Sequence, residues 1–291
     1  MNLNIKNANE LINELFPKQN IYCPHNDGIK LMHQHYNDYG WADGELYLYL
    51  GCSGSWKSGF MLYNLLYTSC RFENDNDAVL YISYENSERE TQSRLINMKV
   101  SEKLNYKHLI VSHPKKDDEN DVFDINNIKG IIDSCNQTYS IKMVAVDYPG
   151  EMDIEKGRNS YEEYGKIAYQ LKKLAEDYNI PVITAMQTNK SVIGNLHNST
   201  ETQDKLLSLS KVSMADISES SKFAHISDHV YFIYRLNQAM FPEYSRDYLF
   251  IKSLKQRTNS LSMEYTFIPF SKNFEILEKN KYVDLIIKEN N

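Results

Sequence analysis

A short loop rich in glycine and serine, with one tryptophan in it, lies between a strand-like run and a helix-like run. Residues 51–58 read Gly-Cys-Ser-Gly-Ser-Trp-Lys-Ser, which matches the pattern G-x-x-x-x-G-K-[ST] at its first glycine and at Lys57 and Ser58. Trp56 stands where the pattern has its second glycine. The residues just before the loop form an apolar, strand-like run, and those after it are apolar and helix-like. A strand, a tight loop and a helix N-terminus direct several backbone N–H groups at one phosphate, so the sequence predicts a nucleotide site here.

Each part of this loop has an expected task. Lys57 would reach the outer phosphates of the nucleotide, and the Ser58 hydroxyl would bind Mg²⁺. The candidate residues for binding the nucleotide are Gly51, Ser53, Gly54, Ser55, Trp56, Lys57 and Ser58. A glycine at position 56 would let the loop approach the phosphate closely. The tryptophan therefore either crowds the nucleotide or indicates that the loop works in a variant form.

Length, composition and net charge limit the kind of protein that this chain can be. The chain has 291 residues, a net charge of −7, 42% hydrophobic residues and 24% charged residues, which is typical of an ordinary soluble globular protein. The acidic balance argues against a protein that coats nucleic acid with a uniformly basic surface, but not against a local basic groove. No apolar run approaches the length of a membrane span. The four cysteines form no Cys-x-x-Cys pair, so we expect a cytoplasmic protein with reduced thiols, no zinc and no membrane contact.

Strand-like and helix-like segments alternate after the loop. The apolar runs of the buried-strand type are residues 78–83, 108–112, 143–147 and 181–186. An amphipathic helix is predicted over 161–178, where apolar residues recur at helical spacing. Continuous apolar strands with helices between them are typical of a parallel sheet that is covered on both faces.

The last part of the chain departs from this alternation. Its strand-like runs have little helix between them and are residues 229–234, 248–254 and 263–267. We interpret them as a β-rich C-terminal extension of the same sheet. No linker or internal repeat is visible, so we expect one domain over 21–291, preceded over 1–20 by a helix or linker segment that could serve in oligomerisation. The polar stretch 189–216 is predicted to be a long loop, and the charged stretch 115–121 a surface turn.

Three polar residues end predicted strands of this sheet. They are Glu85, Asp147 and Gln187. Nucleotide hydrolysis on a parallel sheet needs a carboxylate that supports the metal, a base that orients water and a sensor of the outer phosphate, all at the carboxyl ends of neighbouring strands. We expect Asp147 to support Mg²⁺ through water, Glu85 to be the base and Gln187 the sensor. Polar residues at strand ends are common, but their joint occurrence after a phosphate loop is much more specific.

These segments, in order and spacing from about Gly40 to Glu278, resemble the RecA-type ATPase core of DnaB-type hexameric replicative helicases. Ser-Tyr-Glu-Asn at 83–86 is similar to the family's S-L-E-M, Val-Asp-Tyr at 146–148 is similar to I-D-Y, and Asp-Ile-Ser-Glu-Ser at 216–220 is similar to D-L-R-E-S. The resemblance implies a RecA-like, mostly parallel twisted sheet flanked by helices. It implies an ATP- and Mg²⁺-dependent helicase or translocase on single-stranded DNA in DNA replication, here phage-like and without the N-terminal domain that contacts primase in bacterial members. It also implies a homo-oligomer with active sites at subunit interfaces, and contacts with other replication proteins.

The segment Lys255-Gln256-Arg257 resembles the K-x-R that this family projects into the neighbouring subunit's site. The resemblance implies that Arg257 is an arginine finger acting in trans, with Lys255 beside it, and that both stabilise charge on the γ-phosphate. Taken alone, Lys-x-Arg is more often a solvated basic tip of a hairpin.

Loops that face the channel of the ring contact DNA in this family. The basic candidates in the corresponding loops here are Lys156, Arg158, Lys190, Lys205 and Lys211. Such lysines and arginines would hold phosphates without sequence preference. An ordinary mobile surface loop is the alternative.

Two other functions stay open on the sequence. One is a recombinase-like or accessory ATPase that coats DNA as a filament. The other is a nucleotide-binding module that lost hydrolysis through Trp56. The presence of Glu85, Asp147 and Arg257 together argues against the second, because a module that only binds nucleotide needs neither a base nor a finger.

Overall fold

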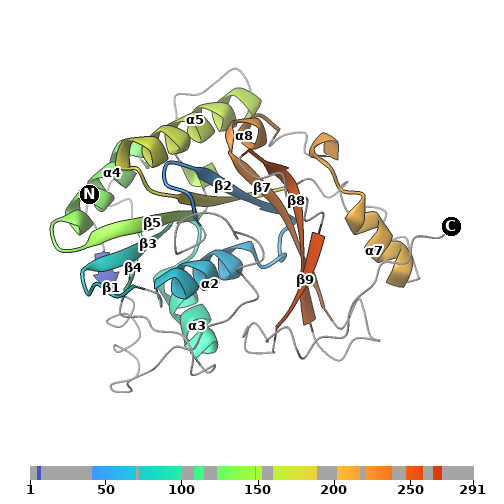
Figure 1. Cartoon of the computed structure of the whole chain (residues 1–291), viewed down its shortest axis with the longest axis horizontal. Helices are drawn as coiled ribbons and strands as arrows, with labels where there is room; N and C mark the ends of the chain where they lie inside the picture. Colours follow the sequence, from blue (N-terminus) through green and yellow to red (C-terminus); the bar gives the residue numbers. More distant parts are fainter. Residues whose placement is uncertain are drawn as a thin grey trace.

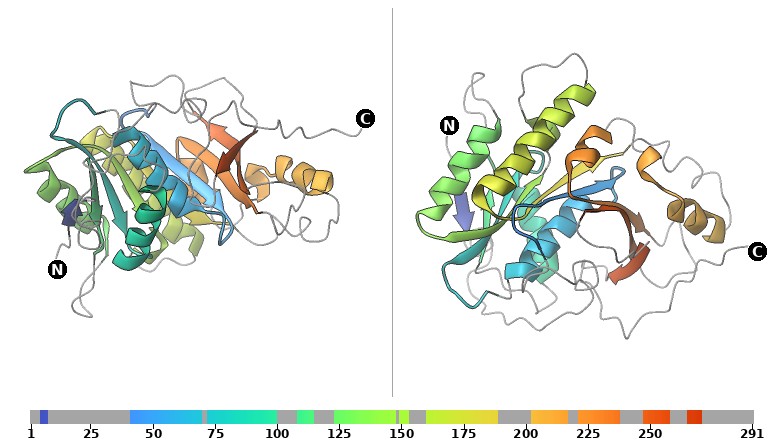
Figure 2. Two further views of the ribbon diagram at one scale, coloured as in Figure 1. Left: turned by 90° about the horizontal axis from the view of Figure 1, so that it is seen from below. Right: turned by 45° about the horizontal axis from the view of Figure 1, so that its top comes forward.

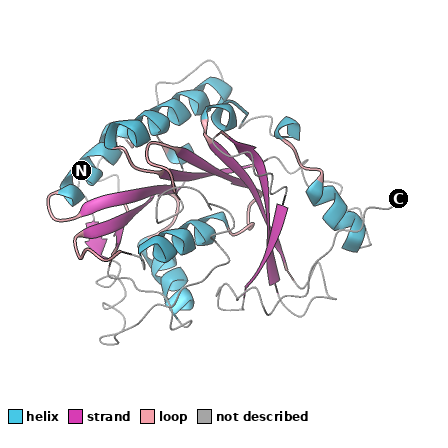
Figure 3. Ribbon diagram, in the orientation of Figure 1, coloured by secondary structure: helices cyan, strands magenta, loops and turns pink. Residues whose placement is uncertain are grey.

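One nine-stranded sheet, in the order β1-β4-β3-β5-β6-β2-β7-β8-β9, runs through the part of the chain described by the computed structural model. Figure 3 shows it as the magenta layer between cyan helices. The described residues are 5–7, 41–69, 72–99, 108–114, 123–147, 149–152, 160–188, 202–216, 221–237, 247–257 and 265–270. The strands are β1 (Ile5–Asn7), β2 (Leu46–Gly51), β3 (Asp77–Ser83), β4 (Leu109–Ser112), β5 (Ser140–Asp147), β6 (Val182–Gln187), β7 (His229–Leu236), β8 (Asp247–Gln256) and β9 (Tyr265–Phe270).

The sheet is parallel in its middle and antiparallel at both edges. The strands from β4 to β7 in this order pair in parallel. Strand β1 pairs antiparallel with β4, and β8 and β9 continue the sheet antiparallel beyond β7. The α/β class, the mostly parallel sheet and its β-rich C-terminal extension are therefore confirmed.

Helices cover both faces of this sheet. They are α2 (Lys57–Ser69), α3 (Glu88–Lys99), α4 (Ile125–Asn136), α5 (Ser160–Tyr178), α7 (Thr202–Ser210) and α8 (Ser221–Ile226), with short 3₁₀ turns at Pro149–Glu151 and Met214–Asp216. Figure 1 shows α4, α5 and α8 above the sheet, and α2 and α3 below it. None of the helices in the described residues combines the length and the apolarity that crossing a membrane requires.

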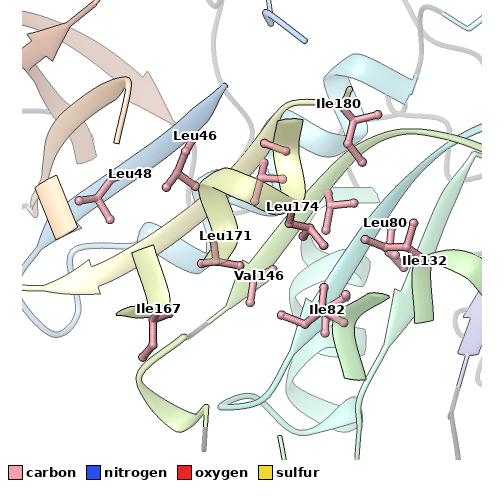
Figure 4. Packing of buried hydrophobic residues seen from close by; sticks show 14 of the residues in the cluster. Leu46, Leu48, Leu80, Ile82, Ile132, Val146, Ile167, Leu171, Leu174 and Ile180 are labelled. Atoms are coloured by element: carbon pink, nitrogen blue, oxygen red, sulfur yellow. The ribbon is translucent and has the colours of Figure 1, made fainter. Parts of the chain in front are cut away.

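Strand β2 lies inside the sheet because its two faces are both apolar. Leu46, Leu48 and Leu50 belong to the buried cluster beneath α5, part of which is seen in Figure 4. Tyr47 and Tyr49 point to the other face, into the cluster that contains the side chains of α2. Since β2 pairs in parallel with β6 on one side and β7 on the other, the loop after it leaves from the interior of the sheet.

The last residue of β2 is a glycine because the neighbouring strand passes very close to it. A Cβ placed on Gly51 would lie 2.3 Å from the carbonyl oxygen of Ile233 in β7 and 3.1 Å from the Cβ of Ser55. Carbon and oxygen atoms do not approach this closely without a shift of the backbone. The packing of the sheet thus requires this glycine before any ligand is considered.

The predicted loop over 189–216 is wrong in part, because residues 202–210 form helix α7. Leu206, Leu209 and Val212 are buried in a third cluster against β7 and β8. Both views in Figure 2 show α7 near the C-terminal strands, at the end of the molecule away from α4. The segment is mostly polar, and its buried face contributes only one i, i+3 pair of leucines within the helix. This is too weak a periodic pattern to predict a helix from the sequence. Residues 8–16 and 115–121, predicted to be a helix and a turn, lie outside the described residues.

Because several tyrosines are buried, we expect the protein to unfold in alkaline solution. Burial raises the pKa of Tyr47, Tyr49 and Tyr81 above the ordinary value of about 10. Above about pH 10 the unfolded chain loses tyrosine protons that the folded chain retains, so the free energy of unfolding falls as the pH rises. On alkaline titration we expect the tyrosinate absorbance of these residues to appear together with loss of far-ultraviolet circular dichroism. Tyr49→Phe should make the decline less steep, and ionisation of all 22 tyrosines near pH 10 with unchanged dichroism would contradict the prediction.

Candidate nucleotide-binding site

A cavity of about 300 Å³ opens where β2, β3, β5 and β6 end. The residues singled out in the sequence that line it are Ser53, Gly54, Trp56, Lys57, Ser58, Glu85, Asp147 and Gln187. Gly51 and Ser55, the other two candidates from the loop, are buried and do not line the cavity. The cavity is also lined by Gly59, Asn86, Arg94, Ala185 and Arg235. Strands far apart in the sequence therefore bring the expected phosphate, metal and base residues to one place.

The loop is closed on itself by short backbone and side-chain contacts. The N–H of Ser55 donates to the carbonyl oxygen of Cys52 at 3.1 Å, and Gly54 turns the chain with a φ of 78°. The Lys57 ammonium donates to the carbonyl oxygens of Gly51 at 2.8 Å and Cys52 at 2.9 Å. Burial lowers the pKa of Lys57, while the nearby Cys52, Asp147 and Glu85 act in the opposite direction. The ammonium thus lies within the loop and close to the carboxylates across the cavity.

Trp56 occupies a backbone conformation that suits glycine. Its φ is 69°, in the left-handed region where a bulky side chain is strained. Its carbonyl oxygen accepts from the N–H of Phe60 at 2.9 Å, the first hydrogen bond of α2. The side chain is half-buried and packs against the cluster that includes α2. The tryptophan therefore keeps the backbone form of the glycine that the loop pattern has at this position.

The Asp147 carboxylate is fixed by two donors on the same oxygen. The Tyr81 hydroxyl donates to Oδ2 at 2.5 Å, and the Asn86 side-chain amide donates to it at 2.8 Å. Asn86 is itself held by Ser83, whose hydroxyl accepts from the backbone N–H of Asn86 at 3.1 Å. Burial, and secondly the charge of Asp147, raise the pKa of Tyr81, so its hydroxyl stays a donor. The orientation of the carboxylate is set before any ligand arrives.

Three further polar residues line the cavity and were not predicted as site residues, namely Asn86, Arg94 and Arg235. Arg94 comes from α3, and within the described part of the chain its Nη1 is buried without a hydrogen-bond partner. Arg235 lies on β7 and donates through Nε and Nη2 to Oδ2 of Asp247, at 3.0 and 2.6 Å. The only available signal for Arg94 was its place in the helix that follows the strand ending beside Glu85.

The predicted finger residues lie away from this cavity. Lys255 donates to the carbonyl oxygens of Ala224 at 3.3 Å, His225 at 2.5 Å and Ser227 at 2.6 Å, and so caps the C-terminus of α8. Arg257 is 56% exposed, and its Nη1 donates to Oδ1 of Asp228 at 2.8 Å.

Asp228 is a buried carboxylate that joins several elements. Its side chain is 2% exposed. Its Oδ2 accepts from Lys172 of α5 at 2.8 Å and from the N–H of Leu46, the first residue of β2, at 2.9 Å. With Arg257 on its other oxygen, Asp228 links the start of β2, helix α5 and the end of β8. This structural role could not be predicted from local sequence, because neither Lys172 nor Leu46 is near Asp228 in the chain.

The DNA-contact candidates are only partly described. Lys156, Arg158 and Lys190 lie outside the described residues. Lys205 is half-buried in α7, and Lys211 is exposed just after it. Neither lysine lines the cavity.

The donor atoms at the cavity fit magnesium. Ser58 and Asp147 supply a hydroxyl and a carboxylate, and hard oxygen ligands of this kind, together with water and phosphate oxygens, are what Mg²⁺ prefers. Among the described residues, no three His, Cys, Asp or Glu side chains gather into a metal-binding group. Any Mg²⁺ here would thus depend on a bound nucleotide for most of its ligands.

Comparisons with known proteins place the fold and the family. The family described as "DnaB-like helicase C terminal domain" matches residues 30–275. The replicative DNA helicase DnaB of Mycoplasma pneumoniae is 26% identical over 221 residues, which cover 68% of this chain and 44% of that protein. That of Mycoplasma genitalium is 24% identical over 217 residues, with the same shares. The chain spans less than half the length of these curated relatives.

Two solved structures have the same fold. The ATPase domain of G40P superposes with a TM-score of 0.61 at 17% identity, covering 82% of this chain and 86% of that one. A DnaB-like replicative helicase, solved in a study of its interactions with primase, gives a TM-score of 0.60 at 15% identity, covering 82% of this chain and 58% of that one. At these identities the likeness shows the RecA-like fold.

The hydroxyl of Tyr81 should contribute more to stability than that of another buried tyrosine. Tyr81→Phe removes a donor to a carboxylate and should lower the free energy of unfolding by about 1.5–3 kcal/mol. Tyr49→Phe is the matched control, since the Tyr49 hydroxyl accepts from Asn64, whose amide also donates to the Phe60 carbonyl at 2.9 Å. The control should lose roughly 0.5–1.5 kcal/mol. Urea unfolding measures both, and equal losses would show that the bond to Asp147 has no special weight.

Proposed function

Since this chain belongs to the family of DnaB-like helicase C-terminal domains, we propose that it is an ATP-driven motor that acts on single-stranded DNA in replication. It hydrolyses ATP with Mg²⁺ at the cavity beside the loop 51–58 and couples hydrolysis to translocation and strand separation. It works as a homo-oligomer, with one active site at each subunit interface.

The observation that carries this proposal is the convergence around one cavity. Lys57 and Ser58 from the loop, Glu85 after β3, Asp147 at the end of β5 and Gln187 at the end of β6 all line it. A site that only binds nucleotide needs the loop and the metal carboxylate, but no second carboxylate across from them. Glu85 in the same cavity favours hydrolysis over binding alone.

Each residue has a part in the proposed reaction. Lys57 would exchange its carbonyl partners for phosphate oxygens of the nucleotide, and the Ser58 hydroxyl would hold Mg²⁺. Bound Mg²⁺ neutralises charge that develops on the phosphates. Asp147, whose carboxylate accepts hydrogen bonds from Tyr81 and Asn86, would support the metal ion through water.

The second carboxylate and the amide act on the water and the γ-phosphate. Glu85 is exposed at the end of β3 and accepts a proton from the attacking water. Gln187, exposed at the end of β6, senses the γ-phosphate. Arg94 adds a positive charge at the wall of the cavity, which suits a triphosphate.

The finger acts from the neighbouring subunit. Within the described residues, the Arg257 guanidinium donates through Nη1 to Asp228, and it is more than half exposed, so it can reach a partner outside its own chain. Lys255 stands beside it but is occupied with carbonyl oxygens of α8. Lys156, Arg158, Lys190, Lys205 and Lys211 remain the proposed DNA contacts.

The proposal predicts DNA-stimulated ATP hydrolysis that needs residues from two subunits. We expect Lys57→Ala to abolish turnover by removing the cation at the phosphates, and Arg257→Ala to lower it roughly 10³-fold. Asp228 keeps Lys172 in the second variant, so the fold should survive. The rate of phosphate release, with and without single-stranded DNA, measures both. Lys129→Ala is the control, because Lys129 is on α4 and pairs with Asp177 on the surface.

Mixing the two inactive variants tests the arrangement in trans. A mixed oligomer contains some interfaces with an intact loop from one subunit and an intact finger from the other, so part of the rate should return. If mixing restores none of the rate, Arg257 either acts in the site of its own chain or has only a structural role. Nucleotide binding without turnover in the wild type would overturn the motor and leave a binding module. Filaments in place of rings by electron microscopy would favour the recombinase-like alternative.

A further inference from the structure

The indole of Trp56 lies directly on the backbone of Gly59, in the first turn of α2. A Cβ built on Gly59 would meet Nε1 of Trp56 at 2.2 Å, Cε2 at 2.4 Å and Cδ1 at 2.8 Å. The atoms concerned belong to a rigid ring, so rotation of a flexible end cannot relieve the overlap. Any side chain at position 59 therefore excludes the tryptophan from its place.

The same contact explains how the loop tolerates a tryptophan. The left-handed backbone at Trp56, with φ of 69°, is strained and persists only where the surroundings hold it. The indole packs on Gly59 and against the cluster that includes α2, and these contacts stabilise the left-handed conformation of Trp56. Lys57 and Ser58, which lie between the two residues in the chain, then face the cavity with Trp56 and Gly59 at its wall.

We propose that Trp56 and Gly59 are a matched pair of positioning residues that fixes the phosphate loop in its nucleotide-binding form. The ring of Trp56, seated on Gly59, holds the turn into α2, and so sets where Lys57 and Ser58 meet the phosphates. The inference rests on the proposed function in one respect only, namely that the loop binds a nucleotide. Neither residue takes part in the chemical step.

The pair makes a specific prediction about substitutions, because the loss of affinity caused by Gly59→Ala should disappear once Trp56 is replaced. Gly59→Ala in the wild-type background displaces the indole, disturbs the loop and should weaken binding of MgADP roughly tenfold or more. In a Trp56→Gly background the same alanine meets no ring, and alanine is favoured over glycine in a helix. The double variant Trp56→Gly/Gly59→Ala should therefore bind MgADP about as well as Trp56→Gly alone. Calorimetric titration with MgADP measures the four affinities.

Gly130→Ala is the matched control for a helical glycine. Position 130 lies in α4, and a Cβ there would have no atom within 4 Å. This variant should bind MgADP like the wild type, which separates the effect of the indole from that of alanine in a helix.

Fluorescence tests the pair without any nucleotide. The chain has two tryptophans, and Trp41→Phe leaves Trp56 as the only indole. Gly59→Ala in that background should shift the emission of Trp56 to longer wavelength and make it more accessible to acrylamide. If the Trp41→Phe chain does not fold, the difference spectrum between the wild type and Trp56→Gly reports the same residue, and the Gly59→Ala spectrum is compared with it.

The proposal that Trp56 and Gly59 act as a pair would be contradicted if Gly59→Ala caused equal losses of affinity in both backgrounds. It would also be contradicted if Gly59→Ala left the emission of Trp56 unchanged. A wild-type chain that binds no MgADP would reject the proposed function, and the emission and quenching comparisons on nucleotide-free protein would still decide whether the pair exists.

Discussion

The close approach of β2 and β7 at Gly51 is the constraint on which the site depends. A Cβ on the last residue of β2 would lie 2.3 Å from the Ile233 carbonyl oxygen, so only glycine fits at this position, where the chain leaves an interior strand of the sheet. The ends of β3, β5 and β6 lie on the same side, because these strands are parallel to β2. A phosphate loop that begins at this point is therefore surrounded by strand ends without further arrangement.

Burial then determines how the polar groups at this edge behave. Asp147 is almost completely buried, and its Oδ2 receives two donors, one from within β3 and one from just after it. Lys57 lies in the same environment, where burial lowers its pKa and the carboxylates oppose that shift. Charges in a partly buried site interact more strongly than they would in water, which suits the proposed role of this edge in binding nucleotide phosphates.

The sequence was most informative where a pattern reflects local physics. Apolar runs of strand length located the middle strands, and the loop 51–58 located the edge at which Glu85, Asp147 and Gln187 meet. Helix α7 was missed because its buried face depends on contacts with β7 and β8, which a polar segment does not reveal. The Asp228 cluster joins residues about 180 positions apart, and nothing local marks such a contact. The roles of the site residues, and the trans action of Arg257, stay predictions.

The overlap between position 59 and the indole also limits the order in which such a loop can evolve. With a side chain at 59, a change from glycine to tryptophan at 56 has no place for the ring, so glycine at 59 must come first. While the tryptophan occupies this place, a change from glycine to alanine at 59 is obstructed by its ring. The overlap thus couples the residues that can stand at positions 56 and 59, although these two side chains are not neighbours in the chain.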